Sequence, residues 1–114
     1  MKSHETWNSQ TADPGLLYRC KAAIRGIIPD ADVILYGSRA RGDAISDSDY
    51  DILVLSDERV NIKMKEDLVS CIYPIELETG EVLTLIAYSR NDWNSPLYRV
   101  MPFRVNVEQE GVLL

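Results

Sequence analysis

Apolar residues recur at helical spacing in the first third of the chain, which predicts an amphipathic helix. The residues that share this spacing are Leu16, Leu17, Cys20, Ala23, Ile24, Ile27 and Ile28. Asp13 and Pro14 suit an N-cap and a first helical position, and Pro29 ends the pattern. Residues 1–12 show no such period, so we expect a flexible N-terminal tail there and a single domain over residues 13–114.

Three apolar runs have the length and composition of buried strands. They are residues 31–38, 49–56 and 81–89, with the sequences ADVILYGS, DYDILVLS and EVLTLIAYS. In the third run, one side of the strand would carry Val82, Thr84, Ile86 and Tyr88, and the other side Leu83, Leu85 and Ala87. Both sides are mostly apolar, so we expect both faces of this strand to be largely buried.

A second helical stripe runs from Asn61 to about Tyr73 and is followed by Pro74. Proline inside a helix removes a hydrogen bond and clashes with the preceding turn. Pro74 therefore either kinks one long helix or separates it from a short turn through Glu78, and the sequence leaves both interpretations open. A last amphipathic segment spans residues 102–110, and the glycine after it suits a helix C-terminus.

The predicted elements follow the order helix, strand, strand, helix, strand, helix. This order predicts an α+β (two-layer α/β) domain, with a small mixed sheet of three to four strands and helices packed mainly on one face. The chain of 114 residues is long enough for one hydrophobic core and too short for two.

The charge balance limits the classes of partner. The net charge is −6, from 18 acidic and 12 basic residues, which argues against an extended nucleic-acid surface but allows a local phosphate site. The N-terminus is polar and shows no signal peptide, and no apolar run approaches the length of a membrane span. We therefore expect a cytoplasmic protein that does not enter the membrane.

Asp49 and Asp51 stand at the start of the second strand, where aspartate is disfavoured. Side chains alternate along a strand, so the two carboxylates should share one face while Tyr50 and Ile52 point to the other. Two like charges at this spacing repel each other unless a cation neutralises them, and oxygen ligands suit Mg²⁺ or Mn²⁺. The pair therefore predicts a divalent metal site.

Gly37 and Ser38 form a turn at the end of the first strand. Gly37 lets the backbone approach a ligand, and Ser38 offers a hydroxyl and a backbone amide to an anion. Arg39 and Arg41 add donors for phosphate, with Arg39 the preferred one; the alternative for both is a solvated turn with ion pairs to nearby aspartates. We expect a nucleoside triphosphate to bind between this turn and the two aspartates.

The aspartates admit two other interpretations. One is an acidic strand end that faces solvent and binds nothing. The other is a calcium loop, because the EF-hand ligand positions would fall on Asp47, Asp49, Asp51 and Glu58. An EF-hand requires glycine at its sixth position, where this chain has Ile52 inside a strand, so the calcium loop is rejected.

Gly37-Ser38, ten intervening residues and Asp49-Tyr50-Asp51, all between apolar strands, resemble the GS…DxD signature of the DNA polymerase beta-type nucleotidyltransferase superfamily. The runs SRARG and SDSDYDILV are similar to the small bacterial minimal nucleotidyltransferase (MNT) domains. The resemblance implies Mg²⁺ or Mn²⁺ as cofactor, ATP or another NTP as substrate, and transfer of a nucleoside monophosphate to a hydroxyl. It also implies a helical HEPN-type protein as a partner.

The chain departs from this family at one catalytic position. The family usually has a third carboxylate on the strand after the intervening helix, and strand 82–89 contains no acid. The usual position falls near Val82 or Thr84. Glu81, at the strand's start, is the candidate third catalytic residue beside Asp49 and Asp51, although a one-residue slip turns it to the opposite face of the sheet.

Two functions from different classes stay open. The first is a metal-dependent enzyme that transfers AMP from ATP to a hydroxyl of a partner protein. The second is a catalytically weak or inactive module that acts as an antitoxin or binding partner of a HEPN-type protein. The missing acid separates them, because it would contribute to metal binding and to proton removal. A homodimer or a hetero-complex is compatible with so small a domain.

Overall fold

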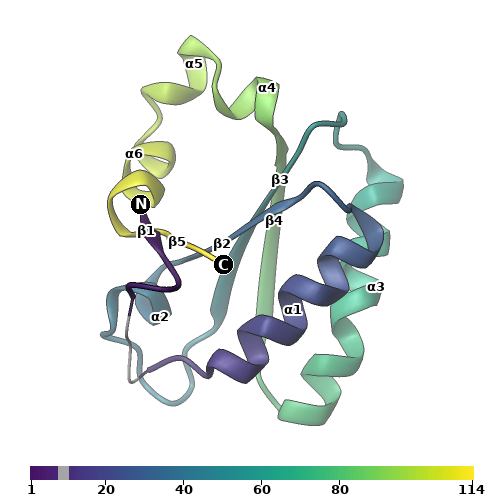
Figure 1. Cartoon of the computed structure of the whole chain (residues 1–114), viewed down its shortest axis with the longest axis vertical. Coiled ribbons are helices and arrows are strands. Elements are labelled where there is room, and N and C mark those ends of the chain that lie inside the picture. The colour runs from purple at the N-terminus through teal and green to yellow at the C-terminus, as the bar shows by residue number, and fades with distance from the viewer. Residues whose placement is uncertain (8–10) are drawn as a thin grey trace.

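The computed structural model describes residues 1–7 and 11–114, which form one mixed β-sheet with helices packed against it (Figure 1). The strands are β1 (Lys2–Ser3), β2 (Asp32–Tyr36), β3 (Tyr50–Ser56), β4 (Leu83–Ser89) and β5 (Val112–Leu113). The helices are α1 (Pro14–Ile27), α2 (Ser38–Arg41), α3 (Ile62–Thr79), α4 (Arg90–Trp93), α5 (Pro96–Arg99) and α6 (Pro102–Glu110).

The sheet has the order β1-β5-β2-β3-β4. Strands β2 and β3 run antiparallel, and β3 and β4 run parallel, connected by the crossover helix α3. Strands β5 and β1 extend the sheet beyond β2. The predicted α+β class with a mixed sheet is confirmed. The sheet has five strands instead of three to four, because β1 and β5 are two residues long and too short to produce an alternating pattern.

The two longest helices, α1 and α3, lie side by side on one face of the sheet (Figure 1). The core between them and the sheet includes Ile24 of α1 and Ile52 of β3, both fully buried. The short helices α4, α5 and α6 cover part of the opposite face, where Trp93 and Val107 pack against Leu53. Helices therefore cover both sides of the sheet, and its central strands β2 and β3 are mostly buried. Strand β4, whose two faces we expected to be largely buried, is mostly half-buried and exposes Thr84.

Local sequence signals set the helix ends. The Asp13 carboxylate accepts the backbone N–H of Gly15 at 2.9 Å, and α1 ends before Pro29. Helix α3 begins in the same way, because the Asn61 side chain accepts the backbone N–H of Met64 at 2.9 Å.

Helix α3 continues through Pro74 to Thr79, so Pro74 lies inside one long helix. Ile72 and Ile75 flank the proline and are only 2% and 5% exposed. Their burial against the core stabilises the helix across the hydrogen bond that proline cannot make. Gly80, with φ of 73°, then ends the helix.

Part of the predicted N-terminal tail makes defined contacts. Strand β1 pairs with β5, and Trp7 packs on the core with its ring N–H donating to the carbonyl of Ala40 at 3.1 Å. The sequence did not indicate these contacts, because they depend on partners far along the chain. Residues 8–10 lie outside the described residues, and the flexibility of the tail stays a prediction.

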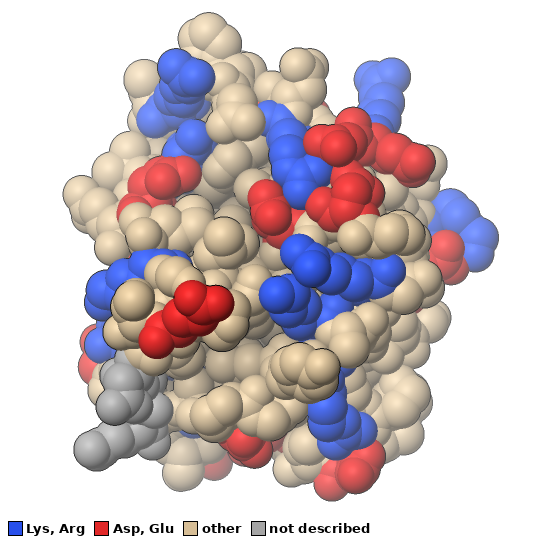
Figure 2. Space-filling model, viewed as in Figure 1, with Lys and Arg blue, Asp and Glu red and all other residues tan. Residues whose placement is uncertain are grey.

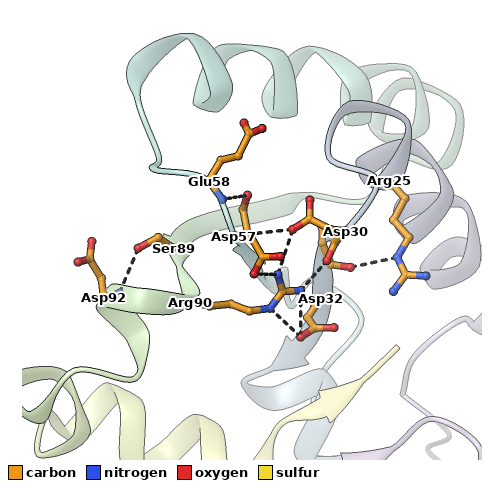
Figure 3. Close-up of polar contacts among 10 residues, drawn as sticks. Arg25, Asp30, Asp32, Asp57, Glu58, Ser89, Arg90 and Asp92 are labelled. Atoms are coloured by element: carbon orange, nitrogen blue, oxygen red, sulfur yellow. Dashed lines mark hydrogen bonds and ion pairs between the residues drawn. The ribbon is translucent and has the colours of Figure 1, made fainter.

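Arg90 follows β4 and forms ion pairs at the start of β2 and the end of β3 (Figure 3). Gly37 follows the other end of β2. Its Nη1 lies 2.7 Å from Oδ1 of Asp57 and 3.1 Å from Oδ2 of Asp30, and its Nη2 lies 3.3 Å from Oδ2 of Asp32. The three aspartates precede β2, begin β2 and follow β3. One guanidinium therefore offsets the mutual repulsion of three carboxylates that the topology brings together.

Asp30 should make the fold sensitive to acid. The backbone N–H of Asp57, together with the guanidinium of Arg90, lowers the pKa of the Asp30 carboxyl below its usual 3.8. A lowered folded pKa contributes stability that is present above the unfolded pKa and is lost as the pH falls through the folded pKa. We expect Asp30→Asn to remove this part of the acid sensitivity, measured by urea unfolding from about pH 6 to about pH 2.

Asp92→Asn is the matched control for this prediction, because Asp92 lies on the same helix as Arg90 but outside the cluster (Figure 3). It should retain the acid profile of the wild type. The assignment would be contradicted if Asp30→Asn and the wild type lost stability in parallel over this pH range.

Acidic and basic side chains are intermingled on the face shown in Figure 2, where they alternate over short distances. None of the helices in the described ranges is both long and apolar enough to cross a membrane.

Candidate functional site

Gly37 forms the turn that connects β2 to α2. Its φ of 76° lies in the left-handed region, which other residues adopt only at a cost. A Cβ placed on Gly37 would lie 2.3 Å from Oδ2 of Asp51, far inside the contact distance of two atoms. The absent side chain therefore allows the Asp51 carboxylate to lie directly against the turn. Ser38 follows as the first residue of α2 and is partly buried.

Asp49 and Asp51 flank Tyr50, the first residue of β3. Tyr50 is buried in the core beneath α1 and α3, whereas Asp49 is exposed and Asp51 half-buried. In the register of the sheet, Asp51 of β3 lies opposite Tyr36 of β2 and Thr84 of β4. Strand alternation places Asp51 on the sheet face opposite Tyr50. Asp49 precedes the strand and its charge acts on Asp51, and its place on the same face stays a prediction.

The surroundings of Asp51 disfavour its charged form. Burial raises the pKa of the Asp51 carboxyl above its usual 3.8, and the negative charges of Asp49 and Glu110 raise it further, while Arg41 opposes them. Burial, assisted by the Asp51 charge, also raises the pKa of Tyr36 to about 12. A divalent cation would relieve the repulsion between these carboxylates.

Glu110, the last residue of α6, is a site residue that the sequence did not indicate. Its Oε1 accepts the backbone N–H of Gly37 at 3.2 Å, and its two oxygens lie 3.3 and 3.2 Å from Nη1 of Arg41. Arg41 also forms an ion pair with Asp43 at 3.2 Å, one of the alternatives that the sequence left open. The structure therefore brings together Gly37, Arg41, Asp51 and Glu110.

The position of Glu110 follows from the pairing of β5 with β2. These strands run antiparallel, with Leu35 opposite Val112. Continuing this register by two residues puts Glu110 opposite Gly37. The only signal in the sequence was Gly111, which predicted the helix end correctly but not the strand contact.

Arg39 lies away from this group and inside the protein. It is only 7% exposed, and its guanidinium carbon lies 4.5 Å from the centre of the Tyr50 ring. Its terminal nitrogens donate to the carbonyls of Thr11 at 2.5 Å, Ser48 at 2.8 Å and Ser46 at 3.3 Å. In this arrangement Arg39 holds the loop before β3 and the N-terminal segment in place. Its contact with phosphate stays a prediction.

Glu81 lies beside Arg39, with Oε2 3.5 Å from Nη2 of that arginine. It thus shares the Tyr50 side of the sheet, as the one-residue slip in the sequence implied. The structure does not bring Glu81 to the aspartate pair. The β4 position beside Asp51 holds Thr84, which is exposed.

The donor set of the site suits a metal that arrives with a nucleotide. Across residues 1–7 and 11–114, no three acidic, cysteine or histidine side chains are placed to hold a metal ion. Two carboxylates, Asp49 and Asp51, are available. Mg²⁺ in nucleotide sites commonly takes one or two carboxylates and completes its shell with phosphate oxygens and water. The two aspartates fit that mode of binding, and Mn²⁺ has similar ligand preferences.

A separate hollow of about 500 Å³ lies between the N-terminal segment and α1. Apolar side chains, among them Trp7, Leu17 and Tyr18, make up most of its lining. None of the described residues that line it is acidic, so it is unsuited to metal and triphosphate.

The fold has a counterpart among solved structures. A crystal structure described as a toxin-antitoxin with AMP-PNP matches it with a TM-score of 0.58 over 84% of this chain and 69% of that chain. The two sequences are 18% identical, so the similarity concerns the fold alone. No curated protein matches the sequence significantly.

A family model, that of the nucleotidyltransferase domain, matches residues 17–99. This range is more than half of the chain and contains the Gly37 turn, the aspartate pair and Thr84. It ends before α6, so Glu110 lies outside it. The match confirms the resemblance seen in the GS and DxD motifs: the chain belongs to the nucleotidyltransferase domain family.

Proposed function

We propose that this protein binds a nucleoside triphosphate, ATP first, together with Mg²⁺, and that it acts in a complex with a second protein. The nucleotide phosphates would lie between the Gly37–Ser38 turn and the Asp49/Asp51 pair. The observation that carries this proposal is the contact of Gly37 with Asp51, since a Cβ on the glycine would lie 2.3 Å from the carboxylate. The two halves of the sequence signature therefore share one surface. A cytoplasmic location remains part of the proposal.

Asp49 and Asp51 would hold the metal. A bound Mg²⁺ would offset the charge of the carboxylates and phosphates and make the α-phosphorus a better electrophile. The chain's own contribution is to orient the phosphates, with Asp51 against the turn and with Arg41, which is exposed and paired with Asp43 and Glu110 in the free protein, as a cationic donor.

Thr84 favours binding over rapid transfer. On β4 it lies next to Asp51 of β3. The nucleotidyltransferases that this sequence resembles usually have an acid on this strand. A threonine hydroxyl cannot serve as a general base near neutral pH. We therefore assign the principal role to a nucleotide-binding antitoxin or binding partner of a HEPN-type protein. The toxin-antitoxin description of the structurally similar protein supports a protein partner.

A second candidate is transfer of AMP to a hydroxyl of that partner, and the complete GS turn and aspartate pair favour it. In this reaction the acceptor oxygen bonds to the α-phosphorus, the bond from phosphorus to the bridging oxygen breaks, and pyrophosphate leaves. The acceptor's proton must pass to a base. Since Glu81 is paired with Arg39, that base would come from the partner or from water.

Asp51→Asn is expected to weaken ATP binding in the presence of Mg²⁺ by at least about tenfold, because it removes half of the charge that attracts the metal. Asp49→Asn should act in the same direction. Titration calorimetry with and without Mg²⁺ measures both effects. Asp47→Asn, in the exposed loop before the pair, is the matched control and should bind as the wild type does. Equal Mg-ATP affinity in Asp51→Asn and the wild type would contradict the proposed metal site.

A transfer assay separates the two candidates. Labelled ATP, Mg²⁺ and the HEPN-type partner would be incubated with the wild type and with both asparagine variants. Label that appears on the partner only with the wild type supports the enzyme. Retained binding without transfer supports the binding module, and a wild type that binds no ATP would overturn both.

A further inference from the structure

Glu110 places a carboxylate on donors that a phosphate would need. Its Oε1 accepts the Gly37 N–H at 3.2 Å, and both of its oxygens lie within 3.3 Å of the Arg41 guanidinium. A phosphate oxygen would make the same kinds of contact, to a backbone amide and to an arginine. These donors therefore already bind an oxyanion, which is the carboxylate of Glu110.

The backbone of Glu110 is fixed while its side chain can leave. Helix α6 ends against β2, since a Cβ on Gly111 would lie 2.5 Å from the Val107 carbonyl and 3.1 Å from Cγ2 of Ile34. Val107 is itself fully buried. The Glu110 side chain, in contrast, is 22% exposed. Rotation about its side-chain bonds would move the carboxylate into solvent without displacing the helix.

The charges around the turn oppose a nucleotide that arrives without metal. Glu110 adds a third negative charge to those of Asp49 and Asp51, and Arg41 offsets only part of the total. A triphosphate would bring further negative charge to the same place. A divalent cation between the aspartates and the phosphates would reduce this repulsion.

We propose that Glu110 is an internal competitor of the nucleotide phosphates: it occupies the Gly37 and Arg41 donors in the free protein and leaves when a nucleotide binds with its divalent cation. This inference rests on the proposed nucleotide-binding function. It makes Glu110 a contributor to the metal requirement of the site, beside Asp49 and Asp51. ATP with Mg²⁺ displaces the carboxylate, whereas ATP alone does so poorly.

Two other roles for Glu110 predict different results. A metal ligand would make Mg-ATP binding weaker when its charge is removed. A carboxylate that only completes the sheet edge would affect stability and leave nucleotide affinity unchanged. A competitor predicts tighter binding of metal-free nucleotide after the charge is removed, together with release of the Gly37 N–H from Glu110 when the wild type binds nucleotide, whereas charge repulsion alone predicts only the first.

Glu110→Gln tests the inference, because glutamine keeps the shape and an oxygen acceptor for the Gly37 N–H but removes the charge. We expect the affinity for ATP without Mg²⁺ to rise about fivefold, with a smaller rise for Mg-ATP. Inorganic pyrophosphate is a second probe without a base or sugar. Glu108→Gln is the control: Glu108 lies on the same helix and pairs with Arg104, away from the turn, so both affinities should stay at wild-type values.

Unchanged or weaker binding of metal-free ATP by Glu110→Gln would overturn the inference, and the proposed function would stand if the wild type binds Mg-ATP. Absence of Mg-ATP binding in both proteins would overturn the function and the inference with it. Nuclear magnetic resonance of the wild type gives a test that needs no variant. The Gly37 amide should shift on saturation with Mg-ATP, and a Gly37 amide that does not move would overturn the inference.

Discussion

Replacing Gly37 with alanine is expected to lower the free energy of unfolding by about 2–4 kcal/mol, because two penalties meet at this residue. A side chain at φ of 76° and ψ of −159° costs about 1–3 kcal/mol by itself. The added methyl group would also lie 2.3 Å from Oδ2 of Asp51 and force the carboxylate away. Urea unfolding measures the loss of stability, and displacement of Asp51 should also weaken Mg-ATP binding.

Two other glycines separate these penalties. Gly80→Ala reports the penalty of a left-handed backbone without a clash, since its φ is 73°, its ψ is 3° and nothing lies within 4 Å of the added Cβ. Gly26→Ala lies inside α1, with open space around the Cβ, and should be neutral or stabilising. The excess loss at Gly37 over Gly80 contains the contact with Asp51 and the difference in ψ, which is −159° at Gly37 and 3° at Gly80. Equal losses at the two positions would show that the turn and the aspartate do not touch.

Trp93→Ala is expected to lower the free energy of unfolding by about 3–5 kcal/mol, the usual cost of deleting a large buried ring. Trp93 is 2% exposed and packs against the rings of Tyr88 and Phe103, with centroid distances of 5.6 and 5.9 Å. The Arg104 guanidinium carbon lies 4.9 Å from the indole ring. The indole thus packs α4 and α6 against the sheet. In Trp93→Ala, the rate of amide hydrogen exchange should therefore increase more in α6 than in α1, relative to the wild type.

Leu97→Ala is the control for Trp93, because this leucine on α5 is 72% exposed. Its effect should stay within about 0.5 kcal/mol. Denaturant unfolding of both variants checks the comparison. A loss below about 1 kcal/mol in Trp93→Ala would mean that the indole does not hold the C-terminal helices on the sheet.

Helices α1, α3 and α6 and strands β2, β3 and β4 followed from patterns that are local in the chain, whereas the short helices α4 and α5 were not predicted. Asp13 and Asn61 cap their helices through hydrogen bonds that span two and three residues, so a short window of sequence contains all the information needed. Pro74 shows the limit of such windows. Its local chemistry disfavours a helix, and the burial of Ile72 and Ile75 in the assembled core decides in favour of one.

The two arginines of the candidate site show the same division. Their sequence context favoured Arg39 for phosphate contact, yet the folded chain buries its guanidinium over Tyr50 and leaves Arg41 on the surface. Which arginine faces solvent depends on how α2 packs on β3, and that packing cannot be predicted from the residue type alone. The same packing places Arg39 beside Glu81, and the two side chains form an ion pair.

The sequence by itself determined which face of the sheet Asp51 lies on and that a glycine turn precedes it, because strand alternation and glycine's conformational freedom are properties of the local backbone. Only the tertiary structure decided that Glu110 meets Gly37, a contact between residues 73 positions apart. That contact depends on the register of the two-residue strand β5 against β2, and so short a strand has no pattern of its own from which its register could be predicted.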